Sequence, residues 1–301
     1  MENVFTVNSS SDWALPRMSC LINFSTLSEL YCVAPFRSFS VKYVCRGTEK
    51  YHVNGNKYTV EDGQYLLANH FSEGFVEIDN TVRGICIDVA PDVLSEVVAS
   101  YRRPDTFIAD PGLDTFFNSP DFLENKFRGS DTHTGRWLHS LDLRMLREDS
   151  LAIRFSREFY FTLAEHLLAD HIPVYKELQS IKGVKRTTRK ELYRKVSMGK
   201  EYIDSAYLQN IHVADIASKC NLSEYHFYRT FKSAFGISPH QYIIQKRLAF
   251  GSTLLTEEKM SVSEAAYASG YADAFAFSKS FKKQYGHSPV VLTQRKNATE
   301  N

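Results

Sequence analysis

One helical segment carries side chains suited to hydrogen bonding with a polyanion. Tyr225, Arg229 and Lys232 lie at positions i, i+4 and i+7, so they share one face of a predicted helix. Arginine can donate two parallel hydrogen bonds to a guanine, and lysine can place a point charge against a phosphate. Taken alone, such a stripe is more often an ordinary solvated face. The choice between these interpretations depends on the rest of the sequence.

The same segment occurs twice. LSEYHFYRTFKSAFGISPHQ, from Leu222, returns as YADAFAFSKSFKKQYGHSPV, from Tyr271. Five residues of the first copy are identical in the second at an offset of fifty: Phe227, Phe231, Gly236, Ser238 and Pro239. Each copy begins with a residue suited to a helix N-cap, Ser223 or Asp273, and ends with a glycine suited to a left-handed C-terminal position. Aromatic residues spaced four apart predict one buried helix face in each copy.

A shorter helix is predicted before each long one. These are VADIASKC, from Val213, and VSEAAYAS, from Val262. Small residues in both segments allow close helix packing, and Asn221 or Gly270 is placed to form the tight turn that follows. The pattern is a helix-turn-helix written twice. Duplication favours binding to the major groove of DNA over a merely solvated face.

Residues 189–295 resemble the DNA-binding domain of the AraC family of bacterial transcription regulators. The resemblance rests on IASKCNLSEYHFYRTFKSAFGISPHQYIIQKRLAFGSTLL and SGYADAFAFSKSFKKQYGHSP. It implies a first helix and two helix-turn-helix motifs joined by a long helix, which we expect over residues 239–255 with Pro239 at its first position. It also implies a regulator, expected to be an activator, that acts as a homodimer on double-stranded DNA with RNA polymerase as a partner. The cysteines and the lack of a long apolar run predict that it acts in the cytoplasm with no membrane.

The expected DNA contacts lie at the start and on the outer face of the two long helices. They are Ser223, Tyr225, His226, Tyr228, Arg229, Lys232, Ala274, Phe275, Lys279, Lys282 and Lys283. The first helix is richer in hydrogen-bonding groups, so we expect it to specify most of the site. In the second, Phe275 offers apolar contact to a thymine methyl and the lysines suit phosphates, so we expect it to supply affinity and orientation.

Charge divides the chain unevenly. The 301 residues carry a net charge of +1, but residues 1–183 hold 18 Lys and Arg against 25 Asp and Glu, whereas residues 184–301 hold 18 against 10. Only the C-terminal part therefore has the balance of a polyanion-binding protein. The start of the sequence lacks the features of an export signal, and no apolar run is long enough for a bilayer. Five cysteines without a CxxC pair predict reduced thiols.

The N-terminal part reads as β-structure from Phe36 to Ala90. FRSFSVKYVCRG alternates, with four residues on one side: Phe39, Val41, Tyr43 and Cys45. Turns are predicted at residues 54–56 and 61–63. Six or so short strands predict a small antiparallel barrel or sandwich, and their order resembles the cupin-like effector domain common in AraC-type regulators.

The expected fold is α+β in two domains. Residues 1–172 are expected to form a cupin-like antiparallel β-barrel with flanking helices, which regulates and dimerises. Residues 173–188 are expected to be a linker with some helix in its first half, and residues 189–301 an all-α DNA-binding domain.

Metal-binding cupins carry an HxH motif with a later Glu and His, and His52 and His70 have the wrong spacing for it. We therefore expect no metal and no cofactor. Polar groups on strands of an apolar barrel are the candidate contacts for a small-molecule effector. They are Arg37, Tyr43, His52, His70 and Arg83.

Helices are predicted at residues 92–103, 135–149 and 152–168, with short turns between 108 and 130. The last two helices carry apolar stripes, which either cover the barrel or form a dimer interface. Two other functions compete with the effector-controlled regulator. An enzyme would need the missing cupin ligands or a hydrolase, P-loop or dinucleotide motif, none of which occurs, so we expect no enzyme. A constitutive DNA-binding adapter without a ligand would have a barrel interior packed by large side chains.

Overall fold

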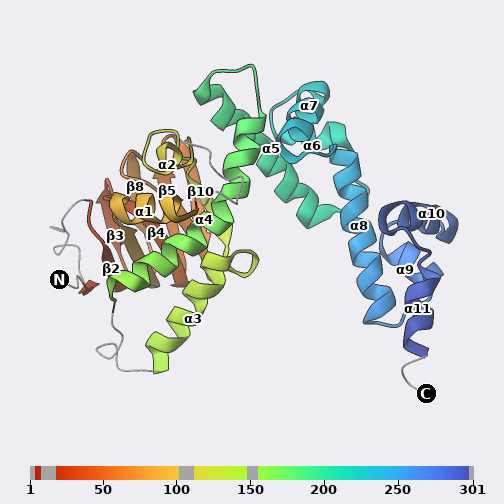
Figure 1. Cartoon of the computed structure of the whole chain (residues 1–301), viewed down its shortest axis with the longest axis horizontal. Helices are drawn as coiled ribbons and strands as arrows, with labels where there is room; N and C mark the ends of the chain where they lie inside the picture. Colours follow the sequence, from red (N-terminus) through yellow and green to blue (C-terminus); the bar gives the residue numbers. More distant parts are fainter. Residues whose placement is uncertain (1–3, 8–17, 102–111, 148–154, 298–301) are drawn as a thin grey trace. The chain divides into compact units, whose positions relative to one another are not determined.

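The computed structural model describes residues 4–7, 18–101, 112–147 and 155–297. The chain divides into two compact units, Met1–Tyr175 and Lys176–Asn301, called here the N-terminal and C-terminal units. Figure 1 shows strands and helices together in the first and helices alone in the second.

Two β-sheets form the centre of the N-terminal unit. The larger has the order β1-β2-β9-β4-β7-β10 and the smaller β3-β8-β5-β6. The strands are β1 (Val4–Val7), β2 (Leu21–Leu27), β3 (Leu30–Val33), β4 (Phe39–Arg46), β5 (Thr48–Val53), β6 (Asn56–Glu61), β7 (Gln64–Ala68), β8 (Gly74–Ile78), β9 (Val82–Val89) and β10 (Asn125–Arg128). Every described pairing is antiparallel except β1 with β2. Among these strands pairing stays within each sheet, so the expected closure into a barrel is not seen.

The predicted hairpin at residue 54 joins β5 to β6. Val53 pairs with Asn56, and the two turn residues both have positive φ, 48° at Asn54 and 78° at Gly55. Two consecutive positive φ values define the type I′ turn, whose twist matches that of the strands. Asparagine and glycine are the residues that adopt this conformation at low cost.

Many apolar side chains are buried between the sheets. Large residues meet there, including Tyr51 on β5, Leu66 on β7 and Phe36 just before β4, all at most 5% exposed. The opposite face of the larger sheet is also buried, because Phe39 on β4 contacts the rings of Phe117 and Phe122, at centroid distances of 5.7 and 4.9 Å. Both faces of β4 are therefore core.

Four helices accompany the larger sheet: α1 (Pro91–Tyr101), α2 (Gly112–Phe117), α3 (His133–Arg147) and α4 (Arg157–Ser180). Figure 1 shows them beside the strands. The predicted apolar stripes of α3 and α4 are largely buried, with Leu141 and Leu163 at most 3% exposed. Trp137 on α3 lies 4.9 Å from Phe159 on α4, and Phe155, just before α4, contacts Phe24 on β2 at a ring-centroid distance of 5.7 Å. The stripes thus cover the sheet.

One predicted region differs from the structure. Residues 108–130, expected to hold only turns, contain α2 and β10 as well as the 3₁₀ turn η1 (Gly129–Asp131), because their aromatic residues complete the sheet core. In the expected linker 173–188, α4 extends to Ser180, as the helix expected in its first half, and α5 begins at Arg186. The expected end of the first helix at Pro104 lies outside the described residues.

The C-terminal unit is helical. Its helices are α5 (Arg186–Ala206), α6 (Val213–Lys219), α7 (Glu224–Phe235), α8 (Pro239–Thr256), α9 (Val262–Ala268), α10 (Ala274–Tyr285) and α11 (Val290–Asn297). The long predicted helix is α8; it has Pro239 at its start and a capping box between Ser238 and Gln241. Within this unit α8 runs from the α6–α7 motif to the α9–α10 motif (Figure 1). Among the described residues no helix is long and apolar enough to cross a membrane.

Candidate DNA-binding interface

The first long helix, α7, is fixed at both ends as its sequence predicts. The Ser223 hydroxyl accepts a hydrogen bond from the backbone N–H of His226 at 3.3 Å, and Gly236 closes the helix at φ 75°. Phe227 and Phe231 are fully buried on its inner face. The preceding turn contains Asn221 at φ 52°. These contacts hold the outer face of α7 toward solvent.

The second long helix, α10, repeats this construction. The carboxylate of Asp273 accepts from the backbone N–H of Ala276 at 2.7 Å, and Gly286 ends the helix at φ 80°. Phe277 and Phe281 are fully buried. The shared residues therefore perform the same structural task in both copies.

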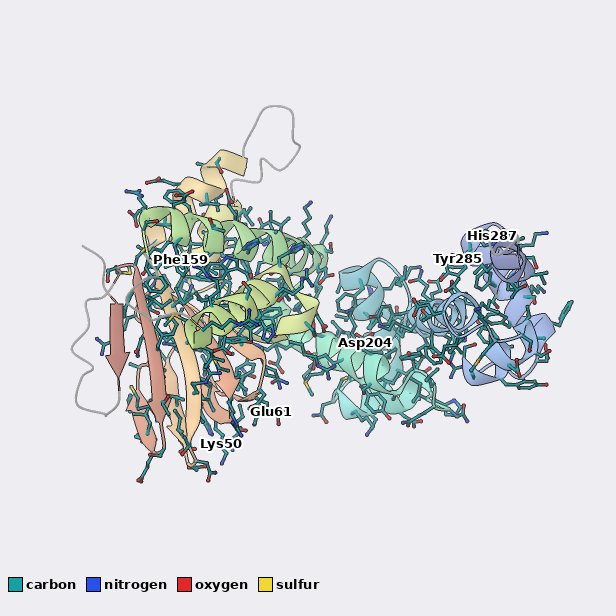
Figure 2. All side chains as sticks on the ribbon, turned by 90° about the horizontal axis from the view of Figure 1, so that it is seen from below. Lys50, Glu61, Phe159, Asp204, Tyr285 and His287 are labelled. Carbon is teal, nitrogen blue, oxygen red and sulfur yellow. The ribbon has the colours of Figure 1, made fainter. Side chains whose placement is uncertain are left out.

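The third aromatic position of each copy is less buried than the repeat predicts. Phe235 is half-buried and Tyr285 is 39% exposed. Tyr285 lies near His287 at the end of α10, with ring centroids 6.4 Å apart (Figure 2). Only the first two turns of each long helix are held deep in its core, because the third lies at the rim of the unit.

Two glycines allow the buried rings to reach their positions. A Cβ atom at Gly199 on α5 would lie 2.5 Å from the ring of Phe227, and one at Gly251 on α8 would lie 2.7 Å from the ring of Phe277. The helix that precedes each motif, α5 or α8, therefore leaves space at its glycine for the first buried phenylalanine of α7 or α10. Sequence analysis did not identify these glycines, although both lie within strongly helical segments where glycine is disfavoured.

Arg247 on α8 ties the two motifs together. Its guanidinium donates to the carbonyl oxygens of Tyr207, Gln209 and Gly270 at 2.7, 2.8 and 3.0 Å. Tyr207 and Gln209 follow α5, whereas Gly270 is the turn of the second motif. One side chain therefore bridges the first half of the unit to the second, a role that the sequence did not reveal.

Asp204 on α5 adds a further connection to α8. Its carboxylate accepts from the Tyr242 hydroxyl at 2.8 Å and lies 2.9 Å from Nζ of Lys246. Burial, together with the bond to Asp204, raises the pKa of Tyr242, so the hydroxyl remains a donor. These bonds fix α8 against α5.

The outer faces of the two long helices carry exposed groups that are free to meet a ligand. On α7, Tyr225 is 74% exposed, and on α10, Phe275 is 79% exposed. Arg229, Lys232 and the other predicted cations are exposed too, and among the described residues none of these cations has a hydrogen bond or ion pair. Of the predicted contacts, Ala274 is half-buried, and Ser223 is already engaged as the N-cap.

The five predicted effector contacts are not gathered in one place. His52 on β5 stacks on Phe75 at 4.3 Å, His70 follows β7 beside Phe71, and Arg37 precedes β4. Tyr43 and Arg83 lie on adjacent strands and face α3, where Arg83 forms a bidentate ion pair with Asp142. Burial lowers the pKa of His70. Only Tyr43 and Arg83 are brought near one another.

A polar cluster between the sheets was missed by sequence analysis. Nζ of Lys42 lies 2.6 Å from Sγ of Cys86, and the Tyr51 hydroxyl donates to Glu49 at 2.6 Å. Burial alone would lower the pKa of Lys42, but Cys86 and Asp88 raise it above its ordinary value. Lys42 alternates with Val41 and Tyr43, so it lies on the opposite face of β4, which the second sheet covers.

Metal-ligating groups do not cluster in the described part of the chain. No set of three or more His, Cys, Asp or Glu side chains is placed there to hold an ion. The five cysteines are free thiols.

Comparisons with known proteins concern mainly the C-terminal unit. Residues 216–295 match a family model described as a helix-turn-helix domain. The probable transcriptional regulator LumQ of Photobacterium leiognathi is 38% identical over 89 residues, which are 30% of this chain and 36% of LumQ. The matches to the first relatives thus cover about a third of their own length.

Two further matches extend over most of this chain. YbfI of Bacillus subtilis, an uncharacterised helix-turn-helix regulator, is 25% identical over 237 residues, 78% of this chain and 77% of YbfI. The crystal structure of ToxT from Vibrio cholerae O395 covers 91% of this chain and 96% of its own at 16% identity, with a TM-score of 0.36.

Proposed function

Because this chain is a member of the AraC family through its C-terminal helix-turn-helix domain, we propose that it binds duplex DNA in a sequence-specific manner and regulates transcription. In this proposal α7 and α10 enter successive segments of the major groove. The observation that carries it is the duplicated helix whose buried face is satisfied internally while its basic and aromatic face is exposed and unpaired.

The spacing of the two motifs supports binding along one face of the duplex. At ~1.5 Å per residue, the eighteen residues of α8 extend over ~27 Å, which is of the order of one DNA turn. Arg247 holds both motifs to α8, so the spacing is set by the protein before it meets DNA. We infer that the operator contains two short elements about one turn apart.

A selection experiment with the full chain tests this proposal. Random duplex DNA is bound, recovered and sequenced over several rounds, and gel shifts then compare the enriched sequence with random DNA. We expect a bipartite motif bound at least ~10³-fold more tightly than random DNA at physiological salt. Equal affinity for enriched and random sequences would exclude the sequence-specific function.

We propose that the N-terminal unit controls this activity and dimerises the protein, with RNA polymerase as a partner on DNA. Apolar side chains that remain exposed on α3, Leu143 at 39% and Leu146 at 63%, support a contact with a second copy. Sedimentation of the full chain is expected to show a dimer that Leu146→Glu weakens at least ~10-fold, by burying a charge at an apolar contact. A wild-type monomer at high concentration would contradict this contact.

The adapter without a ligand remains the second candidate. The apolar cluster between the sheets favours it, because large side chains such as Phe36 and Leu66 occupy part of the place where an enclosed effector would lie. An effector site elsewhere in the N-terminal unit would favour the regulated form.

A further inference from the structure

A pocket on the helical side of the larger sheet lies outside the apolar cluster between the sheets. Its volume is about 430 Å³, within the ~300–1,000 Å³ of small-molecule sites. Strand β4, the turn before β7, the end of β10 and helix α3 all contribute to its wall. The lining includes Tyr43, Asp62, Gln64, Arg128, Arg136 and His139.

Tyr43 is a largely buried residue whose hydroxyl has no hydrogen bond to a described residue. Its side chain is 2% exposed and lines this pocket, and no hydrogen bond joins its hydroxyl to any described residue. Three tyrosines on other strands differ: Tyr51 donates to Glu49, Tyr58 to the carbonyl of Glu124, and Tyr65 to Thr132. The Tyr43 hydroxyl is therefore available to a molecule that occupies the pocket.

Positive charge surrounds the same pocket. Arg128 forms no ion pair or hydrogen bond with a described residue, and Arg136 donates one hydrogen bond to the carbonyl of Ser130 at 2.8 Å. Asp62 is the one described carboxylate of the lining, and its Oδ1 is already engaged by the backbone N–H of Gly47 at 2.5 Å. Two guanidinium groups, a histidine and a free hydroxyl are therefore available to one ligand.

We propose that this pocket binds a small organic anion, whose carboxylate or phosphate group lies between Arg128 and Arg136 while a second oxygen accepts from the Tyr43 hydroxyl. The planar guanidinium of arginine can donate two parallel hydrogen bonds to a carboxylate or to a phosphate. Burial, and then the nearby Cys45 and Asp142, raise the pKa of Tyr43 to about 12, so its hydroxyl stays a donor at neutral pH.

The pocket joins the sheet to α3, the helix that carries exposed Leu146. A bound anion would hold α3 against β4. Because the proposed dimer contact lies on α3, binding of the anion would change the position of that contact. This regulatory consequence rests on the proposed function, whereas binding of the anion does not.

Calorimetric titration of the full chain without DNA tests the site. Three matched probes separate the ligand classes: gluconate carries a carboxylate, glucose 6-phosphate carries a phosphate, and glucose is neutral. Ionic strength is held constant with NaCl. We expect one or both anions to bind with one-to-one stoichiometry. Glucose should bind at least ~10-fold more weakly, because it lacks about one charge-assisted hydrogen bond.

Variants then locate the binding. Arg128→Gln with Arg136→Gln is expected to weaken the preferred anion by at least ~10-fold, and Tyr43→Phe by ~3- to 10-fold. Arg147→Gln, also on α3 but outside the pocket lining, is the control and should change affinity less than ~2-fold. Near-ultraviolet circular dichroism confirms that each variant is folded.

Three results would overturn the proposal: no binding of either anion to the wild type, equal binding of glucose, or an equal loss in Arg147→Gln. Failure of sequence-specific DNA binding would leave the titration unchanged, so the two hypotheses fail separately. A change in operator affinity on adding the preferred anion would link them.

Discussion

Arg229 and Lys282 occupy the exposed faces of α7 and α10, but they carry different hydrogen-bond donors. Arginine presents a planar fork that can pair with two acceptors of guanine, whereas lysine is a point charge. Tyr225, His226 and Tyr228 surround Arg229, while Phe275 and Ala276 precede the lysines of α10. The first helix can therefore discriminate bases by hydrogen bonding and the second mainly by apolar contact.

Arg229→Ala should relax base preference in one element of the operator. The expected loss is ~1–3 kcal/mol of discrimination at the contacted position, because a bidentate pair with guanine is removed. Quantitative gel shifts against single-base operator variants measure it. Lys282→Ala serves as the control, since a phosphate contact should weaken all sequences alike. The division of roles is wrong if Arg229→Ala weakens every sequence equally or Phe275→Ala loses more base preference.

At the scale of elements, the helix that precedes each motif, α5 or α8, determines how closely α7 or α10 packs against it. Gly199 and Gly251 each face a fully buried phenylalanine ring at a distance that excludes a side chain. The pair of helices α5 and α8 thus play equivalent parts in the two halves. Alanine would favour the isolated helix by ~1 kcal/mol, so its effect depends on whether overpacking exceeds that gain.

Gly251→Ala should lower the free energy of unfolding by ~1–2 kcal/mol. A Cβ 2.7 Å from the Phe277 ring forces α8 and α10 apart, and overpacking costs ~1–3 kcal/mol. Urea denaturation of the full chain measures the change, provided that the C-terminal unit gives a resolved transition. Thr253→Ala, exposed on the same helix, should change it by less than ~0.5 kcal/mol. A higher free energy of unfolding in Gly251→Ala would show that the Phe277 ring moves aside without cost.

The guanidinium of Arg247 is the link between the motifs. Its three carbonyl acceptors come from both halves of the C-terminal unit, so its loss should loosen their relative position more than either motif alone. Lysine keeps the charge but cannot reach three acceptors with one planar fork.

Arg247→Lys should weaken binding to the complete operator by ~10-fold while changing affinity for a single element by less than ~2-fold. The reason is that a loosened connection loses the effective concentration of the second motif. Gel shifts with complete and half operators measure both. His240→Ala, exposed on the same helix, is the control. Equal losses on both DNAs would show that Arg247 stabilises the unit without setting the spacing.

At the scale of the whole molecule, charge separates the two units. The excess of Lys and Arg after residue 183 predicts that the salt dependence of DNA binding arises in the C-terminal unit. Replacing Lys282 and Lys283 together by alanine should reduce the slope of log affinity against log salt by about two. Lys50 and Lys57, replaced together in the N-terminal unit, should leave the slope unchanged. A slope that falls equally in both double variants would place DNA on both units.

The sequence by itself determined the features that depend on local periodicity. Caps at Ser223 and Asp273, glycines with positive φ and phenylalanines spaced four apart define each long helix without reference to distant residues. Because the same pattern of caps and phenylalanines occurs twice, it is improbable that it arose by chance. The sequence therefore predicts that the C-terminal unit is α-helical. The turn at Asn54 and Gly55 was predictable for the same reason, since its conformation depends on two neighbouring residues.

Tertiary structure decided which faces are buried and which distant residues meet. Alternation along β4 predicts two faces but cannot tell that a second sheet covers Lys42 while helices cover Tyr43. The close approach of Gly251 to the Phe277 ring and the hydrogen bonds of Arg247 to carbonyl oxygens join residues that are twenty or more positions apart in the sequence. Such contacts depend on how elements pack, and packing is set by the summed burial of many side chains rather than by any local pattern.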